Sequence, residues 1–463
     1  MTGSSNGSDF IRRALEQASD TRYLLIGSGT IESAASVFRD AFGEASATVV
    51  ADPSTMQAAG NRVQETLRNA GVETLEPVVL DCRDLHATSE HVDHLAGALA
   101  PHGAIPLAVG SGTINDLTKL AAHRSKRPYM AVATAASMDG YTAYGASITH
   151  EGLKQTFYCP APRAVIADVN VLADAPSEMN AAGYADLLAK IPAGADWILA
   201  DALGVEPMHG QAWSLVQDRL RDWVADPEAI RRGDKQAVSR LANGLLMTGF
   251  AMQAAKSSRP ASGADHQFSH LWDMQHHEHL GQTPLHGCKV AIGTLASTLL
   301  YERLFEAPIE NLDTARICRN WHTLEDIKVL VEKTHALPDL RRAALDEWRA
   351  KYIGWKELSD RLGFLKATWP KLRDRLREQL LPFEMIRNMF HRAGAPSHPS
   401  EIGMELPRLR RGYDEARQIR RRYTVLDLAT ETGLMGPSLE QIFSADGPWG
   451  TASSEVSQSI PIN

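Results

Sequence analysis

The chain has 463 residues and a formal net charge of −8, with 48 basic against 56 acidic side chains. This acidic balance argues against a protein that binds nucleic acid or an anionic membrane surface, because such proteins present basic surfaces. The most apolar stretches, such as residues 290–300, are too short and too polar to span a bilayer. The first residues lack the apolar run of a signal peptide, and the 4 cysteines lie far apart. We therefore expect a cytoplasmic protein without a membrane span, a disulfide framework or a cysteine-type zinc site.

The first third of the chain alternates short apolar runs with helical patterns. Runs rich in Val, Ile and Ala predict buried strands at residues 23–27, 47–51, 77–80, 105–110 and 129–134. Between them, apolar residues three and four positions apart predict helices at residues 30–42, 53–70 and 89–100. Such alternation is typical of parallel βαβ units, because a tight turn cannot connect neighbouring parallel strands. The pattern predicts an α/β domain with a Rossmann-like parallel sheet.

The pattern changes after residue 146. Residues 146–168 have more β character, which predicts a hairpin around Gly152 followed by a last strand. Beyond residue 175 the apolar positions repeat with a helical period, within residues 179–203, 235–256, 286–305 and 372–390. We therefore expect an α/β N-terminal domain, an all-α C-terminal domain and a flexible tail, over residues 1–175, 176–440 and 441–463.

Two identical turns, Gly-Ser-Gly-Thr-Ile at residues 27–31 and 110–114, each follow a predicted strand and open a predicted helix. Glycines at such a turn allow backbone N–H groups to approach a phosphate at the helix N-terminus. The same residues also suit an ordinary strand-to-helix turn. Asp52 follows the strand predicted at 47–51, where a ribose-binding carboxylate would lie, although it could equally cap a helix that starts at Pro53. Together these features favour a nucleotide site.

A dense group of histidines lies within residues 262–290. His266 and His270 are four positions apart and would share one helix face, either as metal ligands or as packed or surface histidines. A solvated loop is the preferred interpretation for three others, His276, His277 and His279. Two histidines and one carboxylate can hold a metal ion and leave a position open for substrate. Asp186, an acid in an Ala- and Leu-rich helix, is a candidate carboxylate, although a surface position fits it as well.

At these residues the sequence resembles the sn-glycerol-1-phosphate dehydrogenases, which belong to the iron-containing alcohol dehydrogenase and dehydroquinate synthase superfamily. The resemblance rests on five segments in the same order, at residues 110–119, 134–142, 181–190, 257–272 and 285–294. Two later segments are similar to the longer bacterial branch, at residues 393–403 and 421–434. The similarity extends from about residue 20 to about residue 435.

The resemblance implies a set of site residues. Asp186, His266 and His286 would hold one divalent ion, which could be zinc, nickel or iron. Asp139, Asp186 and His270 would contact substrate, and Asp186 and His270 would be the catalytic residues. NAD(H), or alternatively NADP(H), would be bound by Asp52 and by two short segments: Gly112, Thr113, Ile114, Asn115 and Asp116, and then Thr134, Ala135, Ala136 and Ser137. An acidic Asp52 near the ribose favours NAD, because it would repel a 2′-phosphate.

The implied reaction is reversible hydride transfer between NAD(P)H and dihydroxyacetone phosphate, which gives sn-glycerol 1-phosphate. The substrate phosphate needs cationic or backbone donors, for which Lys154 and Arg259 are candidates, although each could be a solvated surface charge. The resemblance also implies a homo-oligomer, in particular a homodimer, that acts on a small phosphorylated substrate without nucleic acid. The alternatives are a related glycerol or polyol dehydrogenase, a cyclase like dehydroquinate synthase, and a non-catalytic NAD-binding sensor.

Two departures from the family pattern affect these predictions. Ala143 stands where relatives usually have Ser, which would remove one hydrogen bond to the cofactor. The interval from His266 to His286 is longer than in the archaeal members, which makes His279 the alternative third ligand. The sequence around His286 matches the family motif directly, so His286 is preferred.

Overall fold

The structure, a computed structural model, describes residues 5–82 and 85–449. Contacts divide the chain into two compact units. The first comprises Met1–Lys190, His209–Ala261 and Arg392–Ala395, and the second comprises Ile191–Met208, Ser262–His391 and Pro396–Asn463. The units alternate along the chain, whereas the sequence pattern predicts a single division, after residue 175. The difference arises because the helices after residue 175 are shared between the units.

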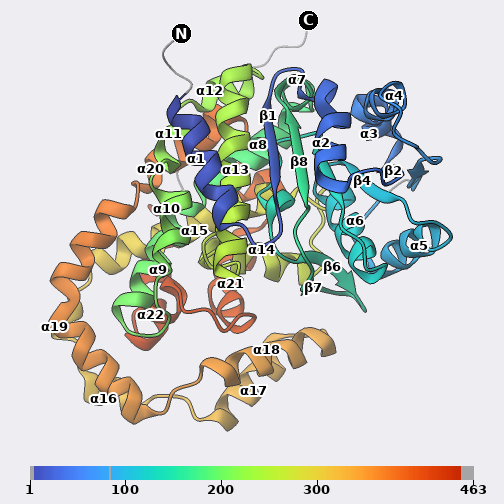
Figure 1. Cartoon of the computed structure of the whole chain (residues 1–463). Coiled ribbons are helices and arrows are strands. Elements are labelled where there is room, and N and C mark those ends of the chain that lie inside the picture. Colours follow the sequence, from blue (N-terminus) through green and yellow to red (C-terminus); the bar gives the residue numbers. More distant parts are fainter. Residues whose placement is uncertain (1–4, 83–84, 450–463) are drawn as a thin grey trace, which may run out of the picture. The chain divides into compact units, whose positions relative to one another are not determined.

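A six-stranded sheet forms the centre of the first unit (Figure 1). Its strand order is β1-β8-β5-β4-β2-β3, and every neighbouring pair is parallel. The strands are β1 (Tyr23–Gly27), β2 (Ala47–Ala51), β3 (Val78–Val79), β4 (Ile105–Gly110), β5 (Met130–Ala133) and β8 (Ala164–Asp168). The parallel α/β fold is thus confirmed, with the predicted bounds reproduced for β1, β2 and β4.

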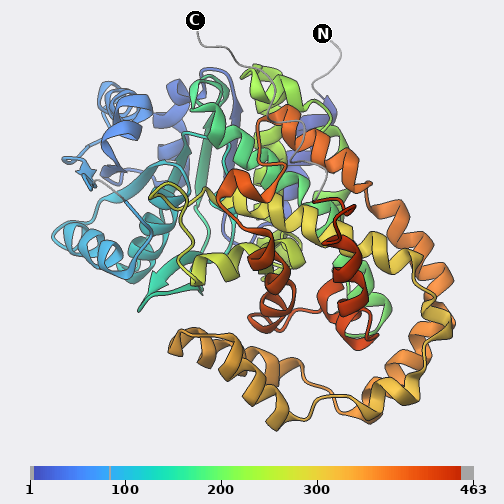
Figure 2. The ribbon, with the colours of Figure 1, turned by 180° about the vertical axis from the view of Figure 1, so that it is seen from behind.

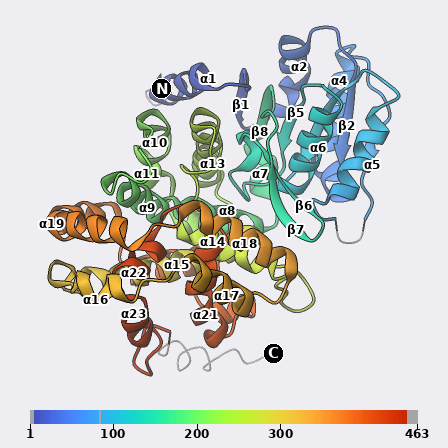
Figure 3. The same cartoon turned by 90° about the horizontal axis from the view of Figure 1, so that it is seen from below.

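Helices flank the sheet as the alternating pattern predicts. On one face, α2 (Ala34–Phe42) and α4 (Asn61–Asn69) pack Phe38, Val63 and Leu67 against Leu107 and Val109 of β4. Next to β4 lies α6 (Gly112–Arg124), which also packs against α5 (Ser89–Leu99) (Figure 3). This layering buries apolar side chains on both faces of the central strands, as a parallel sheet requires.

Two of the predicted helices are less regular than their periodicity suggests. Residues 30–42 begin with a 3₁₀ turn, η1 (Thr30–Ser33), after Gly29 in the left-handed region. Residues 53–70 begin with α3 (Pro53–Thr55) and then widen into a π turn, η2 (Met56–Gly60). The apolar stripe of such a segment still faces the core, so periodicity predicted the buried face but not the local winding.

The predicted hairpin is confirmed. Strands β6 (Ala146–His150) and β7 (Leu153–Phe157) pair antiparallel. The connecting residues Glu151 and Gly152 both have positive φ, at 50° and 77°, which suits a two-residue turn that matches the twist of its strands.

In the sequence, one other helix of the first unit precedes the sheet, and the others come after its last strand, β8. They are α1 (Ser5–Gln17), α7 (Val169–Asp174), α8 (Ser177–Leu188), α10 (Gly210–Gln217), α11 (Leu220–Trp223), α12 (Pro227–Arg231) and α13 (Lys235–Ala255). A short 3₁₀ turn, η3 (Gly140–Thr142), lies between β5 and the hairpin.

The second unit is helical, as predicted. Its helices are α9 (Lys190–Ala202), α14 (Ala264–Met274), α15 (His286–Glu306), α16 (Thr314–Arg319), α17 (Leu324–Thr334), α18 (Pro338–Lys351), α19 (Trp355–Gln379), α20 (Phe383–Ala393), α21 (Leu406–Gln418), α22 (Val425–Glu431) and α23 (Met435–Ile442), with 3₁₀ turns η4 (Ile309–Asn311) and η5 (Pro399–Ile402). The segment from α16 to α19, yellow to orange, can be followed in Figure 2.

The predicted flexible tail over residues 441–463 is described only as far as residue 449. Within that part Ile442 ends α23, and Trp449 is buried with its ring 5.5 Å from that of Phe383. Residues 450–463 lie outside the described residues. Across residues 5–82 and 85–449, no helix combines the length and apolar character needed to cross a membrane.

Candidate active site

The residues predicted to bind the cofactor follow three neighbouring strands of the sheet. Asp52 comes directly after β2, Gly112 begins α6 after β4, and Thr134 comes directly after β5. Because these strands are parallel neighbours, their carboxyl ends meet at one edge of the sheet, where α/β folds bind nucleotides. The backbone N–H of Thr134 donates to the carbonyl of Gly110 at 3.2 Å, which joins the last two segments directly.

The N-terminus of α6 presents its first backbone N–H groups at this edge. Its N-cap residue, Ser111, makes no side-chain capping bond, and the helix runs for 13 residues. The first N–H groups of such a helix and its dipole favour an anion. The Met138 side chain packs closely over Gly112, where a Cβ would lie 3.2 Å from the Met138 Cγ atom. The second glycine turn therefore has the features of a phosphate site.

The side chains of Asn115 and Asp116 form hydrogen bonds within the first unit. The Asn115 amide donates to the carbonyl of Gly140 at 3.3 Å, and the backbone N–H of Ser147 donates to Asp116 at 3.0 Å. These contacts hold η3 and β6 against α6. The cofactor contacts predicted for Asn115 and Asp116 stay predictions, and the structure gives both side chains a structural role as well.

The first glycine turn binds a carboxylate of the chain itself. The backbone N–H groups of Gly29 and Ile31 donate to the buried Asp168 carboxylate at 3.0 and 3.2 Å. Arg62 also contacts Asp168, at 3.1 Å. For the turn at residues 27–31 the phosphate interpretation is therefore wrong, because Asp168 occupies the donors that a phosphate would need.

Asp52 is the N-cap of α3. Its carboxylate accepts the backbone N–H groups of Ser54 and Thr55, each at 2.9 Å, and Pro53 takes the first helical position. The capping interpretation is confirmed, while the ribose contact stays a prediction. The two roles are compatible, since a carboxylate has several acceptor positions.

Asp186 belongs to a buried cluster of charges in the first unit. The Lys190 Nζ atom lies 2.6 Å from the Asp186 carboxylate and 2.7 Å from that of Asp139. The backbone N–H of Asp139 also donates to Asp186, at 3.0 Å. Burial acts to lower the pKa of Lys190, but the two carboxylates outweigh burial and raise that pKa above its usual value. The shift favours the charged form of Lys190 between the two acids.

Lys190 is not among the site residues predicted from the sequence. The observable signal was the spacing of Asp186 and Lys190, four residues apart, which places an acid and a base on one helical face. The surface position considered for Asp186 is wrong, because the residue is completely buried. A buried carboxylate needs a charged partner, and Lys190 supplies it.

Gly183 allows residues 134–139 to approach α8. A Cβ at Gly183 would collide with the carbonyl oxygen of Ala136. The backbone N–H of Ala136 donates to the Asn180 side-chain oxygen at 3.2 Å, which adds a second contact between this segment and α8. This close contact explains how residues 134–139 come to lie beside Asp186.

Three histidines gather in the second unit. His266 and His270 lie one turn apart on α14, and His286 begins α15. The ring of His266 lies 5.3 Å from that of His286 and 6.1 Å from that of His270. Gly293 makes this approach of the two helices possible, because a Cβ there would collide with the Asp265 backbone.

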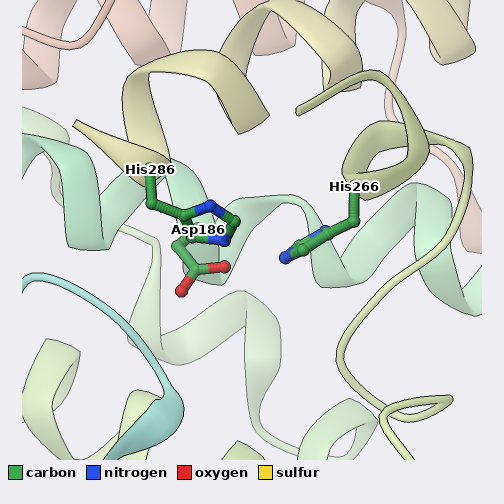
Figure 4. A group of neighbouring side chains, drawn as sticks. All are labelled: Asp186, His266 and His286. Carbon is green, nitrogen blue, oxygen red and sulfur yellow. The ribbon is translucent and has the colours of Figure 1, made fainter. Parts of the chain in front are cut away.

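Asp186, His266 and His286 each offer one potential metal-ligand atom, and these atoms all lie within 4.8 Å of one another. The three side chains point toward one another in Figure 4. One carboxylate oxygen and two imidazole nitrogens form a donor set that suits zinc, nickel or iron. His279, the alternative ligand, is not a member of this group, and its ring packs against Gly403.

The remaining histidines of this region differ in exposure. His276 is exposed, as a solvated loop requires. His277 is buried, so the solvated interpretation is wrong for it. Its Nε2 atom contacts the carbonyl of Ile402 at 2.7 Å and its Nδ1 atom contacts Arg408 at 2.8 Å. Both ring nitrogens thus have partners, which explains why the ring can be buried.

The two candidate phosphate ligands also differ. Lys154 lies on β7 and is half-buried. Arg259 is only 2% exposed, so the interpretation as a solvated surface charge is wrong for it. Their contacts with a substrate phosphate stay predictions.

Comparisons with known proteins show the family of the chain. The family model of the iron-containing alcohol dehydrogenases matches residues 25–176. A glycerol-1-phosphate dehydrogenase (NAD(P)+) from Geobacillus thermodenitrificans is 30% identical over 397 residues, which cover 84% of this chain and 87% of the relative. The enzyme of that name from Methanosarcina mazei is 36% identical, over 60% of this chain and 76% of the relative. The one from Halalkalibacterium halodurans is 34% identical, over 57% of this chain and 66% of the relative.

Solved structures share the fold at lower sequence identity. Glycerol dehydrogenase from Schizosaccharomyces pombe aligns with a TM-score of 0.59 and 15% identity, over 91% of this chain and 90% of the other. Maleylacetate reductase from Agrobacterium tumefaciens aligns with a TM-score of 0.57 and 15% identity, over 91% and 97%. The family model and the sequence relatives lead to one assignment. The chain belongs to the glycerol-1-phosphate dehydrogenase (NAD(P)+) family, within the iron-containing alcohol dehydrogenases.

Proposed function

We propose that this chain catalyses reversible hydride transfer between NAD(P)H and dihydroxyacetone phosphate, with sn-glycerol 1-phosphate as the reduced product. The observation that carries the proposal is the grouping of Asp186, His266 and His286 within 4.8 Å. The names of the sequence relatives support the substrate and the cofactor. In the reduction, the C4–H bond of the nicotinamide breaks, a C–H bond forms at C2 of the ketone, and the C2 oxygen takes up a proton.

The proposed cofactor-binding and metal-binding functions belong to two successive parts of the chain. Residues 1–175 bind the nicotinamide cofactor, and residues 176–440 supply most of the metal and substrate ligands. The backbone donors at the start of α6 bind the pyrophosphate, and Asp52 contacts the adenosine ribose. NAD(H) is the preferred cofactor, because an acidic Asp52 repels the 2′-phosphate of NADP(H).

Asp186, His266 and His286 hold one divalent ion, with zinc, nickel and iron as the candidates. Such an ion, when bound, supplies a Lewis acid for the C2 oxygen of the substrate. The chain contributes one negative charge and two neutral rings to the ligand set. A divalent ion together with these three ligands would therefore carry a net positive charge. Lys190 neutralises much of the charge that Asp139 adds beside it.

The remaining roles belong to side chains around this group. Asp139 accepts a hydrogen bond from the substrate hydroxyl, with its carboxylate held by Lys190. His270, one helical turn from His266, donates the proton to the C2 oxygen, since imidazole can exchange protons near neutral pH. Lys154 and Arg259 bind the substrate phosphate. The family resemblance supports a homodimer, which sedimentation can test. We also propose that the protein acts in the cytoplasm, which cell fractionation can test.

The direct test is NADH oxidation with dihydroxyacetone phosphate on protein as purified, after chelation, and after zinc or nickel is restored. Turnover that disappears on chelation and returns with metal supports the proposal. The product should be sn-glycerol 1-phosphate, which an enzyme specific for sn-glycerol 3-phosphate cannot oxidise. Faster turnover with dihydroxyacetone or glycerol than with their phosphates would favour a polyol dehydrogenase. Tight NAD binding without turnover in any metal state would favour a sensor.

A further inference from the structure

Two side chains outside the proposed ligand set contact the rings of the two ligand histidines. The Asp265 carboxylate lies 3.1 Å from the Nδ1 atom of His266. The Ser269 hydroxyl lies 3.3 Å from the Nδ1 atom of His286. Both contacts are made at Nδ1, and both contacting residues are completely buried on α14.

The Asp265 carboxylate is fixed by the backbone. The same oxygen that meets the His266 ring accepts the backbone N–H groups of Gly263 and His266, each at 2.8 Å. An acceptor held by two backbone donors cannot turn away from the ring without losing both bonds. The His266 ring is therefore held in one orientation by a carboxylate that is itself held.

The start of α14 has a second anchor. The buried Asp196 carboxylate on α9 accepts the backbone N–H of Ala264 at 2.7 Å. The same side chain accepts the hydroxyl of Tyr301 on α15, also at 2.7 Å. Asp196 thus ties the helix that carries His266 to the helix that carries His286.

An imidazole ring that donates its Nδ1–H group to an acceptor presents the lone pair of Nε2 to a metal ion. We infer that Asp265 and Ser269 are positioning residues, which hold His266 and His286 as Nδ1–H tautomers and thereby make Nε2 the ligand atom of each. This inference rests on the metal site of the proposed function and adds the residues that orient its ligands. Removing such an outer hydrogen bond weakens metal binding by about 10- to 100-fold.

The experiment measures zinc affinity on metal-stripped protein by competition with a chromophoric chelator, without substrate or cofactor. Asp265→Ala is expected to weaken zinc binding by about 10- to 100-fold. Asp265→Asn should lie between this variant and the unaltered protein, because an amide oxygen still accepts the backbone and ring N–H groups but lacks the charge. Ser269→Ala should weaken binding by a smaller factor, because it removes a neutral partner.

Two matched variants serve as controls. Asp427→Asn alters another buried carboxylate of the second unit, one that accepts the backbone N–H of Thr424 and pairs with Arg417. Ser297→Ala removes another buried hydroxyl, which donates to Thr294 within α15. Both should bind zinc as the unaltered protein does.

A spectroscopic measurement separates orientation from general stability. In the zinc-loaded protein, long-range ¹H–¹⁵N spectra of the histidine rings should show protonated Nδ1 and zinc-bound Nε2 for His266 and His286. The Nδ1 proton signal of His266 should be lost or shifted in Asp265→Ala. Where that variant does not fold, Asp265→Asn gives the same comparison.

The inference is overturned by zinc affinities within twofold of the unaltered protein for both Asp265 variants, by zinc-bound Nδ1 signals, or by absence of zinc and nickel binding. Zinc binding that depends on Asp265, in a protein that does not reduce dihydroxyacetone phosphate, would contradict the proposed reaction while leaving this inference intact.

Discussion

Lys190 lies between two carboxylates, 2.6 Å from Asp186 and 2.7 Å from Asp139, and its own side chain is completely buried. The lysine begins α9, one helical turn after Asp186. It therefore fixes the proposed metal ligand and the proposed substrate-binding acid in one arrangement. The geometry of the site depends on this pair of contacts before any metal or substrate is bound.

Replacing this lysine should destabilise the fold. Lys190→Met leaves two acids without their shared cation, and breaking a buried ion pair from one side costs about 3 to 5 kcal/mol. Urea unfolding of metal-free protein measures the loss. Lys328→Met, at an exposed lysine 3.8 Å from Glu325, is the control and should leave the free energy of unfolding unchanged. Equal stability of the two variants would contradict the proposed role of Lys190.

Adding a methyl group at Gly183 should disrupt the contact between α8 and residues 134–139, which include the segment predicted to bind the cofactor. Gly183→Ala forces the new Cβ against the carbonyl of Ala136, and overpacking of this kind costs about 1 to 3 kcal/mol or more. NADH affinity, measured by fluorescence titration, should fall together with the free energy of unfolding. Gly97→Ala is the matched control, because that exposed helical glycine has no atom within 4 Å of the new Cβ. It should preserve affinity and raise stability by about 0.5 kcal/mol.

The charge on Asp52 should govern the choice between NADH and NADPH. Asp52→Ser keeps a helix cap for the N–H groups of Ser54 and Thr55 while removing the carboxylate. The ratio of kcat/KM for NADPH to that for NADH should rise by about tenfold, since a like-charge contact near a surface costs on the order of 1 to 4 kcal/mol. Asp234→Ser, which alters the cap of α13, should leave the ratio unchanged. An unchanged ratio in Asp52→Ser would place the ribose elsewhere.

Acid should destabilise the protein through His277. Burial, the largest effect, lowers the pKa of His277 below its ordinary value of 6.5, and Arg408 acts in the same direction. The unfolded chain then binds a proton more readily than the folded one, so stability is complete above pH 6.5 and falls as the pH drops through the folded pKa. Burial lowers the pKa of His335 as well, which adds to the loss.

The comparison that isolates this effect is urea unfolding at pH 7 and pH 5 for the unaltered protein and for His277→Gln. Glutamine can meet Ile402 and Arg408 without gaining a proton, so the variant should lose less stability between the two pH values. The exposed His276→Gln should behave as the unaltered protein does. Identical pH dependence in His277→Gln and the unaltered protein would show that His277 titrates normally.

Much of the fold follows from local sequence patterns. The strands at residues 23–27, 47–51 and 105–110 are continuous apolar runs, which a sheet buried on both faces requires. The π turn at Met56–Gly60 could not be predicted, because the apolar spacing of residues 53–70 fits a regular helix equally well. The alternation of the two units also escaped prediction, since it depends on contacts between helices far apart in sequence.

In the site, too, sequence motifs predicted some residues, whereas contacts between residues far apart in the chain could not be predicted. The family motifs led to Asp186, His266 and His286, which the structure brings together. The two glycine turns have the same sequence, yet Asp168 fills only the first, and no local pattern reveals a carboxylate 139 residues away. The burial of His277 likewise depends on Ile402 and Arg408, which only the tertiary structure supplies.

In the proposed function, hydride transfer depends on a metal ion held by Asp186, His266 and His286. The most direct test compares His286→Gln with His279→Gln, measuring zinc per chain and the rate of NADH oxidation with dihydroxyacetone phosphate in each. This assignment predicts that His286→Gln loses both the bound metal and the turnover, while His279→Gln retains both. Retention of metal and turnover in His286→Gln, with their loss in His279→Gln, would contradict it.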